Sequence, residues 1–437
     1  MKKVVFMVVA FLSAFCFNFG VNAEEITYTE VGTFDALKTA TQNGENVKLT
    51  ADITVSDSVL TIDKSIVIDL NGYTYSGNEP SNINKAIVIT GEDTEVTIND
   101  SSASKSGVIA SADSGTQPRV ISLESGASLI LNDGSIKANG SALAYFAVYM
   151  SNNTSFVMNG GLVEIPTTKG FSMAVNVRTA GASFTMNGGK VSCGFGNAIS
   201  INNGSSTART SVLINAGEVY SAGRAAISGA YGFYQDVTIT GGVINSDSAS
   251  LTQGQNSTLV ISGGEFGADV TLNGTTTITG GVFNSSFTQK GTAEITGGTF
   301  KGDVMFTMPD KLTLGENVTF ENEPVYNDVK IGGNYYLDLA TAVSSAKENA
   351  KIVVLRDTEV TNETLVINKS LIIDLNGHKI TSSINGHLMR IEKGNVEITG
   401  EGTISISTAF KSAIVVKGSN NVEDENYTTV TIGKDVT

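Results

Sequence analysis

Several residue types that commonly stabilise or equip proteins are scarce in this sequence. Among 437 residues there are two cysteines, two histidines, five prolines and no tryptophan. No cluster of cysteine and histidine has the spacing of a zinc site, and the calcium-binding nonapeptide repeat does not occur. Scattered carboxylates would bind calcium weakly at most. We therefore expect no cofactor.

Long hydrophobic runs are absent after the first residues of the chain. Residues 1–23 have the features of a secretory signal peptide: Lys2 and Lys3, the apolar run Val4–Phe19, and the small-residue site Val21-Asn22-Ala23. The run is too short for a membrane anchor, and Phe15 before Cys16 excludes a lipoprotein leader. We predict export and cleavage before Glu24, with no transmembrane segment in the mature chain.

Basic residues are few, with 28 Lys and Arg against 43 Asp and Glu. The leader contains two lysines and no acidic residue, so the mature chain would carry 26 basic and 43 acidic residues, a net charge of −17. This charge disfavours nucleic acid and anionic membranes as partners. Cys193 would be the sole remaining cysteine, which excludes an internal disulfide. A secreted or cell-surface protein held by its core and backbone ladders is expected.

Helical periodicity is rare, and a short repeat takes its place. The pattern is an alternating apolar strand followed by Asn, Thr or Ser and a glycine pair, as in ITGGVF at Ile278 and ITGGTF at Ile295. The residue before the glycines recurs at spacings of 33, 27, 28, 28, 25, 22, 17 and 17. The positions are Asn99, Asn132, Asn159, Asn187, Asn215, Thr240, Ser262, Thr279 and Thr296. Period-two alternation predicts a strand, and the glycines predict a bend before a second strand.

Longer copies contain a third alternating strand, such as AVYM at Ala147 and AVNV at Ala174. Three short strands per copy with loops of variable length predict a right-handed parallel β-helix of all-β class, whose turns stack about 4.8 Å apart. Parity directs Phe156 and Met158 inward and Val157 outward. We expect the asparagines at the bend to form hydrogen bonds along the helix axis. The repeat is therefore interpreted as scaffold, not as a copied active site.

A longer repeat divides the chain. The segment from Val47 and the segment from Ile352 align without gaps at an offset of 305, including IDLNG in both. Helix-like stretches at Phe34–Thr41 and Leu337–Lys347 precede them, and we interpret each as an N-terminal cap. Two modules follow, at residues 24–324 and 325–437. The last residues, TTVTIGKDVT, are similar to the start of another turn, which indicates a fragment of a longer chain.

The IDLNG turn and the serial ITGG turns resemble right-handed parallel β-helix proteins of the pectin-lyase-like superfamily, especially repetitive secreted or surface proteins of gut-type bacteria. The resemblance covers nearly all of the mature chain. It implies the fold more strongly than an activity, because this architecture carries lyases, hydrolases, adhesins and passive rods. Lyases of this type use acidic calcium ligands and a basic Arg or Lys, and polygalacturonase relatives use clustered Asp. The sequence has no Asn-Thr-Asp, Asp-Asp, His-Gly or Arg-Ile-Lys motif.

The two histidines, His378 and His387, give no catalytic pattern. His378 stands where the first module has Tyr73, which indicates an exposed turn position. The best candidate surface is the outward column of the third strand, predicted to contain Val88, Ser122, Tyr149, Asn176, Ser200 and Ser228. Arg178 and Asn202 lie one step further along their strands. Together, Tyr149, Asn176, Arg178 and Asn202 offer an aromatic ring, amides and a cation for a glycan; the alternative is a solvated polar face. Tyr145, Phe146, Tyr231, Phe233 and Tyr234 would either extend this aromatic strip or cover the core.

The sequence thus favours a non-catalytic secreted or surface β-helix protein, adhesin-like or a structural stalk, which binds polysaccharide or a cell-surface glycan. The alternative is a polysaccharide lyase or glycoside hydrolase of the same fold.

Overall fold

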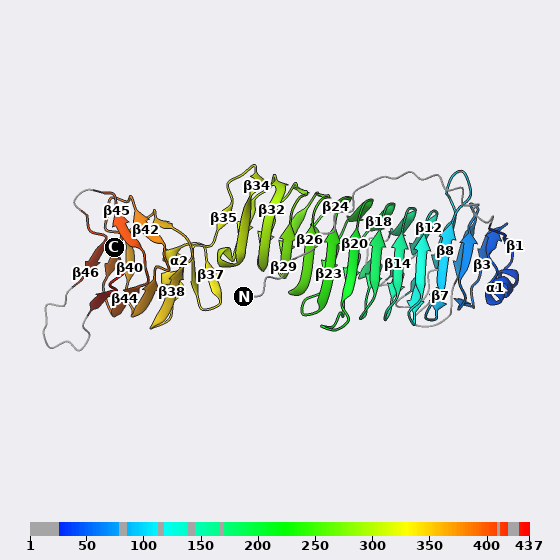
Figure 1. Cartoon of the computed structure of the whole chain (residues 1–437), viewed down its shortest axis with the longest axis horizontal. Coiled ribbons are helices and arrows are strands. Elements are labelled where there is room, and N and C mark those ends of the chain that lie inside the picture. Colours follow the sequence, from blue (N-terminus) through cyan, green and yellow to red (C-terminus); the bar gives the residue numbers. More distant parts are fainter. Residues whose placement is uncertain are drawn as a thin grey trace, which may run out of the picture.

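The strands of this protein stack into long parallel sheets. The structure, a computed structural model, describes residues 26–77, 85–111, 118–138, 145–166, 170–408, 411–417 and 428–437. The predicted signal peptide at residues 1–23 lies outside them. The helical elements in the described ranges are α1 (Phe34–Asn43), α2 (Leu339–Ser345) and the 3-10 turn η1 (Pro309–Lys311). The predicted all-β, right-handed parallel β-helix is confirmed, and its rod shape is plain in Figure 1.

Each coil of the first module contributes a strand to each of three faces. Face 1 comprises β1 (Thr29–Val31), β2 (Val47–Leu49), β5 (Ile66–Asp69), β8 (Glu95–Asn99), β11 (Ser128–Leu131), β14 (Ser155–Met158), β17 (Ser183–Met186), β20 (Thr210–Ile214), β23 (Tyr234–Ile239), β26 (Asn256–Ile261) and β29 (Thr275–Ile278). Face 2 comprises β3 (Ile53–Thr54), β6 (Thr74–Gly77), β9 (Val108–Ser111), β12 (Ser135–Ala138), β15 (Leu162–Ile165), β18 (Lys190–Cys193), β21 (Glu218–Ser221), β24 (Val243–Ser246), β27 (Glu265–Phe266) and β30 (Val282–Phe283). The long strands β32 (Thr292–Phe300) and β34 (Leu312–Phe320) continue both faces.

Face 3 is a separate sheet of twelve parallel strands. These are β4 (Leu60–Ile62), β7 (Lys85–Thr90), β10 (Arg119–Glu124), β13 (Phe146–Met150), β16 (Ser172–Val177), β19 (Gly196–Ile201), β22 (Ala225–Gly229), β25 (Ala249–Thr252), β28 (Asp269–Leu272), β31 (Phe287–Gln289), β33 (Val304–Phe306) and β35 (Val325–Tyr326). β35 pairs with β33, so this sheet continues two residues past the module boundary predicted at residue 324.

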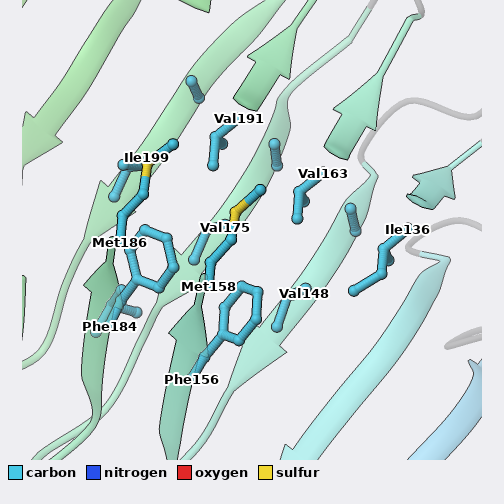
Figure 2. Close-up of a cluster of buried hydrophobic side chains, with 14 of the residues drawn as sticks. Ile136, Val148, Phe156, Met158, Val163, Val175, Phe184, Met186, Val191 and Ile199 are labelled. Atoms are coloured by element: carbon cyan, nitrogen blue, oxygen red, sulfur yellow. The ribbon is translucent and has the colours of Figure 1, made fainter. Parts of the chain in front are cut away.

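Parity determines which side chains form the core. Phe156 and Phe184 stand in register on β14 and β17, with ring centroids 5.0 Å apart, and both are buried. Val157, between Phe156 and Met158, is partly exposed. Figure 2 shows Phe156 and Met158 of face 1 pointing inward among Val163 of face 2 and valines of face 3. The inward and outward assignments made from alternation are therefore confirmed here.

Asparagine side chains form a ladder at the bend between faces 1 and 2. The Nδ2 of Asn132 donates to the Oδ1 of Asn99, and the same bond links Asn159 to Asn132, Asn187 to Asn159 and Asn215 to Asn187, each at 2.8 Å. Thr240 continues the ladder, because its hydroxyl donates to Asn215 at 2.9 Å. The expected axial hydrogen bonding is confirmed.

Helical caps close the N-terminal end of each module, as predicted. Thr33 accepts a hydrogen bond from the N–H of Ala36 at the start of α1, and Gly44 ends this helix with φ +79°. Asp338 caps the start of α2. The amine of Lys369 donates to three carbonyls of the last turn of α2, including that of Ala346 at 2.9 Å. Both helices bury one apolar side on the first coil.

The second module has its own core and smaller sheets. One sheet comprises β36 (Val329–Ile331), β37 (Asn334–Tyr336), β38 (Ala350–Val354), β41 (Leu371–Asp374), β44 (Asn395–Thr399) and β47 (Thr429–Ile432). The other two are β39 (Thr358–Val360), β42 (Lys379–Ser382) and β45 (Thr403–Ile406), and β40 (Leu365–Ile367), β43 (Met389–Ile391) and β46 (Ile414–Val416). Its hydrophobic cluster is distinct from that of the first module.

Polar contacts join the two modules. Asp310 forms an ion pair with Lys330 at 2.5 Å and accepts a hydrogen bond from the hydroxyl of Tyr335 at 3.0 Å. The guanidinium of Arg356 lies 4.1 Å from the ring centroid of Tyr326. Figure 1 shows that the rod narrows here, between β35 and β38.

Candidate functional site

The candidate surface lies on face 3, where strand register brings the predicted column together. Ser122 of β10 pairs with Val88 of β7 and with Tyr149 of β13. Tyr149 pairs with Asn176 of β16, which pairs with Ser200 of β19. Successive members therefore stand one coil apart, at about 4.8 Å. This juxtaposition follows from the parallel register. Four members of the column are buried, namely Val88, Ser122, Asn176 and Ser200, whereas Tyr149 and Ser228 are partly exposed.

Tyr149 lies under two guanidinium groups. The central carbon of Arg119 is 3.5 Å from the Tyr149 ring centroid, and that of Arg178 is 6.0 Å away. The ring of Phe146 meets Tyr149 edge-on, with centroids 5.5 Å apart. Arg178 was a predicted site residue, whereas Arg119 was not. Arg119 is the first residue of the third strand of its coil, in register with Lys85 and Phe146.

The net charge of this site is positive, whereas that of the whole chain is negative. Burial lowers the pKa of Arg119, and the neighbouring Tyr149 and Glu124 oppose that shift. Glu124 is paired with Lys85 at 2.7 Å and accepts a hydrogen bond from Ser122 at 3.0 Å. Burial opposes ionisation of Glu124, but these two partners hold its pKa below the usual value. No ion pair joins Arg119 or Arg178 to a carboxylate in the described part of the chain, so the site has a cationic surplus.

The two predicted amides form a pair of unequal exposure. Asn202 donates to the Oδ1 of Asn176 and to the hydroxyl of Ser200, each at 3.1 Å. Asn202 is partly exposed. Asn176 is completely buried, although parity directs it away from the core. Direct contact with a ligand is therefore available to Tyr149, Arg178 and Asn202, whereas Asn176 positions Asn202.

Buried polar atoms without partners gather around this surface. The Nε of Arg119, the Nδ2 of Asn176 and the hydroxyl of Thr179 are buried and have no hydrogen-bond partner among the described residues. A buried donor without a partner costs about 1–3 kcal/mol, so such atoms are rare unless water or a ligand satisfies them. The three atoms come from the coils of β10 and β16, which flank the coil of Tyr149.

Exposed aromatic side chains flank the same coils. Phe171, directly before strand β16 of face 3, is 60% exposed. The central guanidinium carbon of Arg224 lies 4.3 Å from its ring centroid. Tyr231, in the turn that follows strand β22 of face 3, is 74% exposed. Phe233 and Tyr234 are also exposed, whereas Tyr145 and Phe146 are buried. Of the aromatic residues named from the sequence, Tyr145 belongs to the core, Phe146 is buried against Tyr149 outside the core cluster, and Tyr231, Phe233 and Tyr234 reach solvent.

The histidines occupy structural positions. The Nδ1 of His378 lies 3.5 Å from a carboxylate oxygen of Asp357, and His387 accepts a hydrogen bond from the N–H of Ser412 at 3.1 Å. Cys193 is buried, which raises the pKa of its thiol to about 11. Across the described ranges, no group of three or more His, Cys, Asp or Glu side chains has an arrangement that could hold a metal ion.

Apart from the face 3 surface, a cavity of about 470 Å³ lies in the second module between α2 and the segment that joins β39 to β40. Leu339 and Val343 form part of its lining, with Asp338, Glu359 and Lys369 among the polar groups. Asp338 accepts a hydrogen bond at the start of α2, and Lys369 donates to carbonyl groups at its end. Both side chains therefore stabilise the helix.

The described helices include none that is long and apolar enough to cross a membrane. Fold and register together define the class of protein: a capped, two-module parallel β-helix with a cationic, aromatic surface on face 3. No protein-family model, curated protein or solved structure matches the chain.

Proposed function

We propose that this chain is a non-catalytic β-helix protein of the pectin-lyase-like type, secreted or attached at a cell surface, that binds acidic glycans on face 3. The predicted leader and the acidic composition support the location. The resemblance of the IDLNG and ITGG turns supports the family. The surface around Tyr149 supports the ligand.

One observation carries the glycan proposal. Two guanidinium groups, from Arg119 and Arg178, meet on a tyrosine in a chain whose net charge is −15. Guanidinium groups bind carboxylates and sulfates with paired hydrogen bonds, and aromatic rings stack against the apolar faces of sugars. Uronate and sulfated glycans offer both features in one repeating unit.

The geometry assigns a role to each group. Arg119 covers one side of the Tyr149 ring, which leaves Arg178 and the exposed part of the ring for ligand contact. The amide of Asn202, held by Asn176 and Ser200, offers hydrogen bonds to hydroxyl groups.

Calorimetric titration of residues 24–437 with oligogalacturonate, oligoalginate and a neutral glucan tests this function. We expect the acidic oligomers to bind and the glucan not to bind. Tyr149→Ala and Arg178→Ala should each weaken binding at least about tenfold, the effect of about 1.4 kcal/mol. Arg356→Ala is the matched control, because it removes a guanidinium that lies on Tyr326 at the module junction. Equal affinity in all three variants would refute the site but not the fold.

The runner-up function is a polysaccharide lyase at the same place, and one feature favours it. Arg119 lies against Tyr149 on this surface, and the lyases that the chain resembles use an Arg or Lys as the base. In such a lyase the base removes the proton from C5 of a uronate, and the C5–H electron pair forms a C4–C5 double bond. The C4–O bond breaks to leave an unsaturated sugar, and the departing oxygen takes a proton from water. Prolonged incubation with the same oligomers, followed by ultraviolet absorbance, detects that product. Its release, and its loss in Arg119→Ala, would replace binding by catalysis.

A further inference from the structure

The C-terminal end of the first module leaves a long strand with one neighbour. Among the described residues, β34 pairs with β32 and with no second strand. It is nine residues long, and α1 covers the opposite end of the same rod. A free edge of this length is a template for another strand, and proteins usually shorten or cover such edges.

Backbone groups on this edge point toward the missing coil. In the preceding coils, the carbonyls of core-facing residues accept from the following coil: Phe283 from Lys301 and Phe300 from Glu321, each at 2.8 Å. Phe320 and Val318 stand in register with Phe300 and Gly298. Their carbonyl groups are therefore directed to the side where a further strand would lie.

Core-facing side chains at this end are only partly covered. Leu312, Val318 and Phe320 are half-buried, and Leu314 is 38% exposed. Phe320 ends an aromatic stack in which the ring centroids of Phe283 and Phe300 are 4.5 Å apart and those of Phe300 and Phe320 are 5.2 Å apart. A strand added here would place its own side chain on the open face of Phe320.

A groove beside the edge has room for such side chains. It has a volume of about 330 Å³ and lies between the two modules. Leu312, Leu314, Pro309 and Tyr326 of the first module form one side, and Leu355 and Arg356 of the second module form the other. The apolar lining fits branched aliphatic side chains.

The surroundings of the edge are acidic. Glu316, Glu321 and Glu323 are exposed, and no ion pair involves any of them in the described part of the chain. Lys311 is the basic residue here without an ion pair in the described part of the chain, since Lys330 is paired with Asp310 and Arg356 of the groove with Asp328. Charge complementarity therefore favours a strand that carries lysine or arginine on its outward side.

We propose that β34 binds an extended peptide by strand addition, with the peptide parallel to β34. Its apolar residues alternate toward the core and an aromatic residue stacks on Phe320. A basic residue beside Thr319 is the diagonal neighbour of Glu321. This is β-augmentation, in which backbone hydrogen bonds supply affinity and alternate side chains supply specificity. The partner is thus a segment of another protein whose sequence is similar to one coil of this chain but is basic. The glycan surface on face 3 has no part in it.

Fluorescence anisotropy with labelled Ala-Lys-Ile-Thr-Gly-Gly-Lys-Phe tests this site. The probe copies residues 293–300 with lysine at the outward positions of Glu294 and Thr299. Saturable binding to residues 24–437 is expected. N-methylation of the two lysine backbone nitrogens, which would donate to Leu312 and Val318, should weaken binding at least about tenfold. The same probe with glutamate for lysine should bind at least about fivefold more weakly at low salt.

Two protein variants locate the binding. Leu314→Lys should weaken binding at least about tenfold, because it places a charge on the apolar edge. Val243→Lys is the matched control, since Val243 is 43% exposed on β24, and its affinity should stay within about twofold of the unchanged protein. Melting temperatures of both variants show that they fold. No binding of the lysine probe, or equal loss in both variants, overturns the proposal. Self-association that Leu314→Lys abolishes, without probe binding, would show that a second copy is the occupant instead.

Discussion

Replacement of a single internal asparagine of the ladder tests how much these side-chain bonds contribute to stability. Asn187 donates to Asn159 and accepts from Asn215, both at 2.8 Å, so Asn187→Ala removes two hydrogen bonds. A hydrogen bond contributes about 0.5–1.5 kcal/mol net, and exposed ones lie at the low end. Because Asn187 is exposed, we expect a loss of about 1 kcal/mol in the free energy of opening this coil.

Position within the ladder should change this cost. Asn99 accepts the amide of Asn132, its one bond to another ladder member, so Asn99→Ala should cost about half as much as Asn187→Ala. Asn187→Thr should also cost about half, because a threonine hydroxyl continues the ladder at Thr240. Thr185→Ala serves as the control, since it alters an outward side chain of the same strand.

Native-state hydrogen exchange is the suitable assay, because stacked coils open locally and a global unfolding curve averages over them. The amides of β17 and its neighbours in the variants are compared with those of the unchanged protein. Equal opening free energies for Asn187→Ala and Thr185→Ala would refute a stabilising ladder. Equal costs for Asn187→Ala and Asn99→Ala would refute the assumption that each bond contributes independently.

Three further outcomes follow from other contacts. Phe283→Ala should cost about 3–5 kcal/mol in denaturant unfolding, because this buried ring is stacked between two others, 4.5 Å from Phe300; a cost below about 1 kcal/mol would contradict the stack. Burial opposes ionisation of Asp100, but backbone N–H groups, including that of Gly107 at 2.6 Å, hold its pKa below the usual value. Its stabilising effect is therefore complete above the unfolded pKa of about 3.9 and is lost as the pH falls through the lower folded value, so Asp100→Asn should flatten the acid limb of a pH–stability curve. Gly196→Ala should lower the melting temperature much more than Gly232→Ala, because both have positive φ but a Cβ on Gly196 would lie 2.0 Å from a backbone oxygen, whereas one on Gly232 meets nothing within 4 Å.

Local alternation predicted much of this architecture because the core face of a strand is a local property. Phe156 and Met158 alternate with Val157, and register with β17 then follows from the stacking of like residues. The cap helices were also predictable, although α2 ends at Ser345, two residues before the predicted end. Ala346 there adopts an extended conformation and begins the path to β38.

Parity could not predict what lies over an outward position. Asn176 faces away from the core and is nevertheless buried, because burial depends on neighbouring coils and loops that are distant in sequence. Arg119 was missed for the same reason. Its place at the start of β10 follows from the repeat, but nothing local shows that its side chain will cover a tyrosine of the next coil.

Inward-facing polar residues escaped the sequence analysis as well. Gln235, Gln253 and Gln289 are buried, and the Nε2 atom of each donates to backbone carbonyls near the end of face 3. Gln235 donates to the carbonyl of Ile201 at 2.9 Å and Gln253 to that of Thr275 at 3.1 Å. These glutamines supply donors at corners where the backbone turns and its own ladder is interrupted. That such a glutamine is buried can be predicted only when the position of the corner is known.

Coil length differs between the part of the first module that contains the predicted site residues and the part that does not. Between Asn99 and Thr240 successive ladder positions are 25 to 33 residues apart, whereas between Ser262 and Thr296 they are 17 apart. A coil of 17 residues holds three short strands and their bends, and leaves few residues for loops. Every predicted site residue, and the exposed aromatic residues around them, lies within the longer coils. Ligands are usually bound by loops on a rigid scaffold, and the longer coils have the loop residues that the proposed glycan site requires, whereas the 17-residue coils do not.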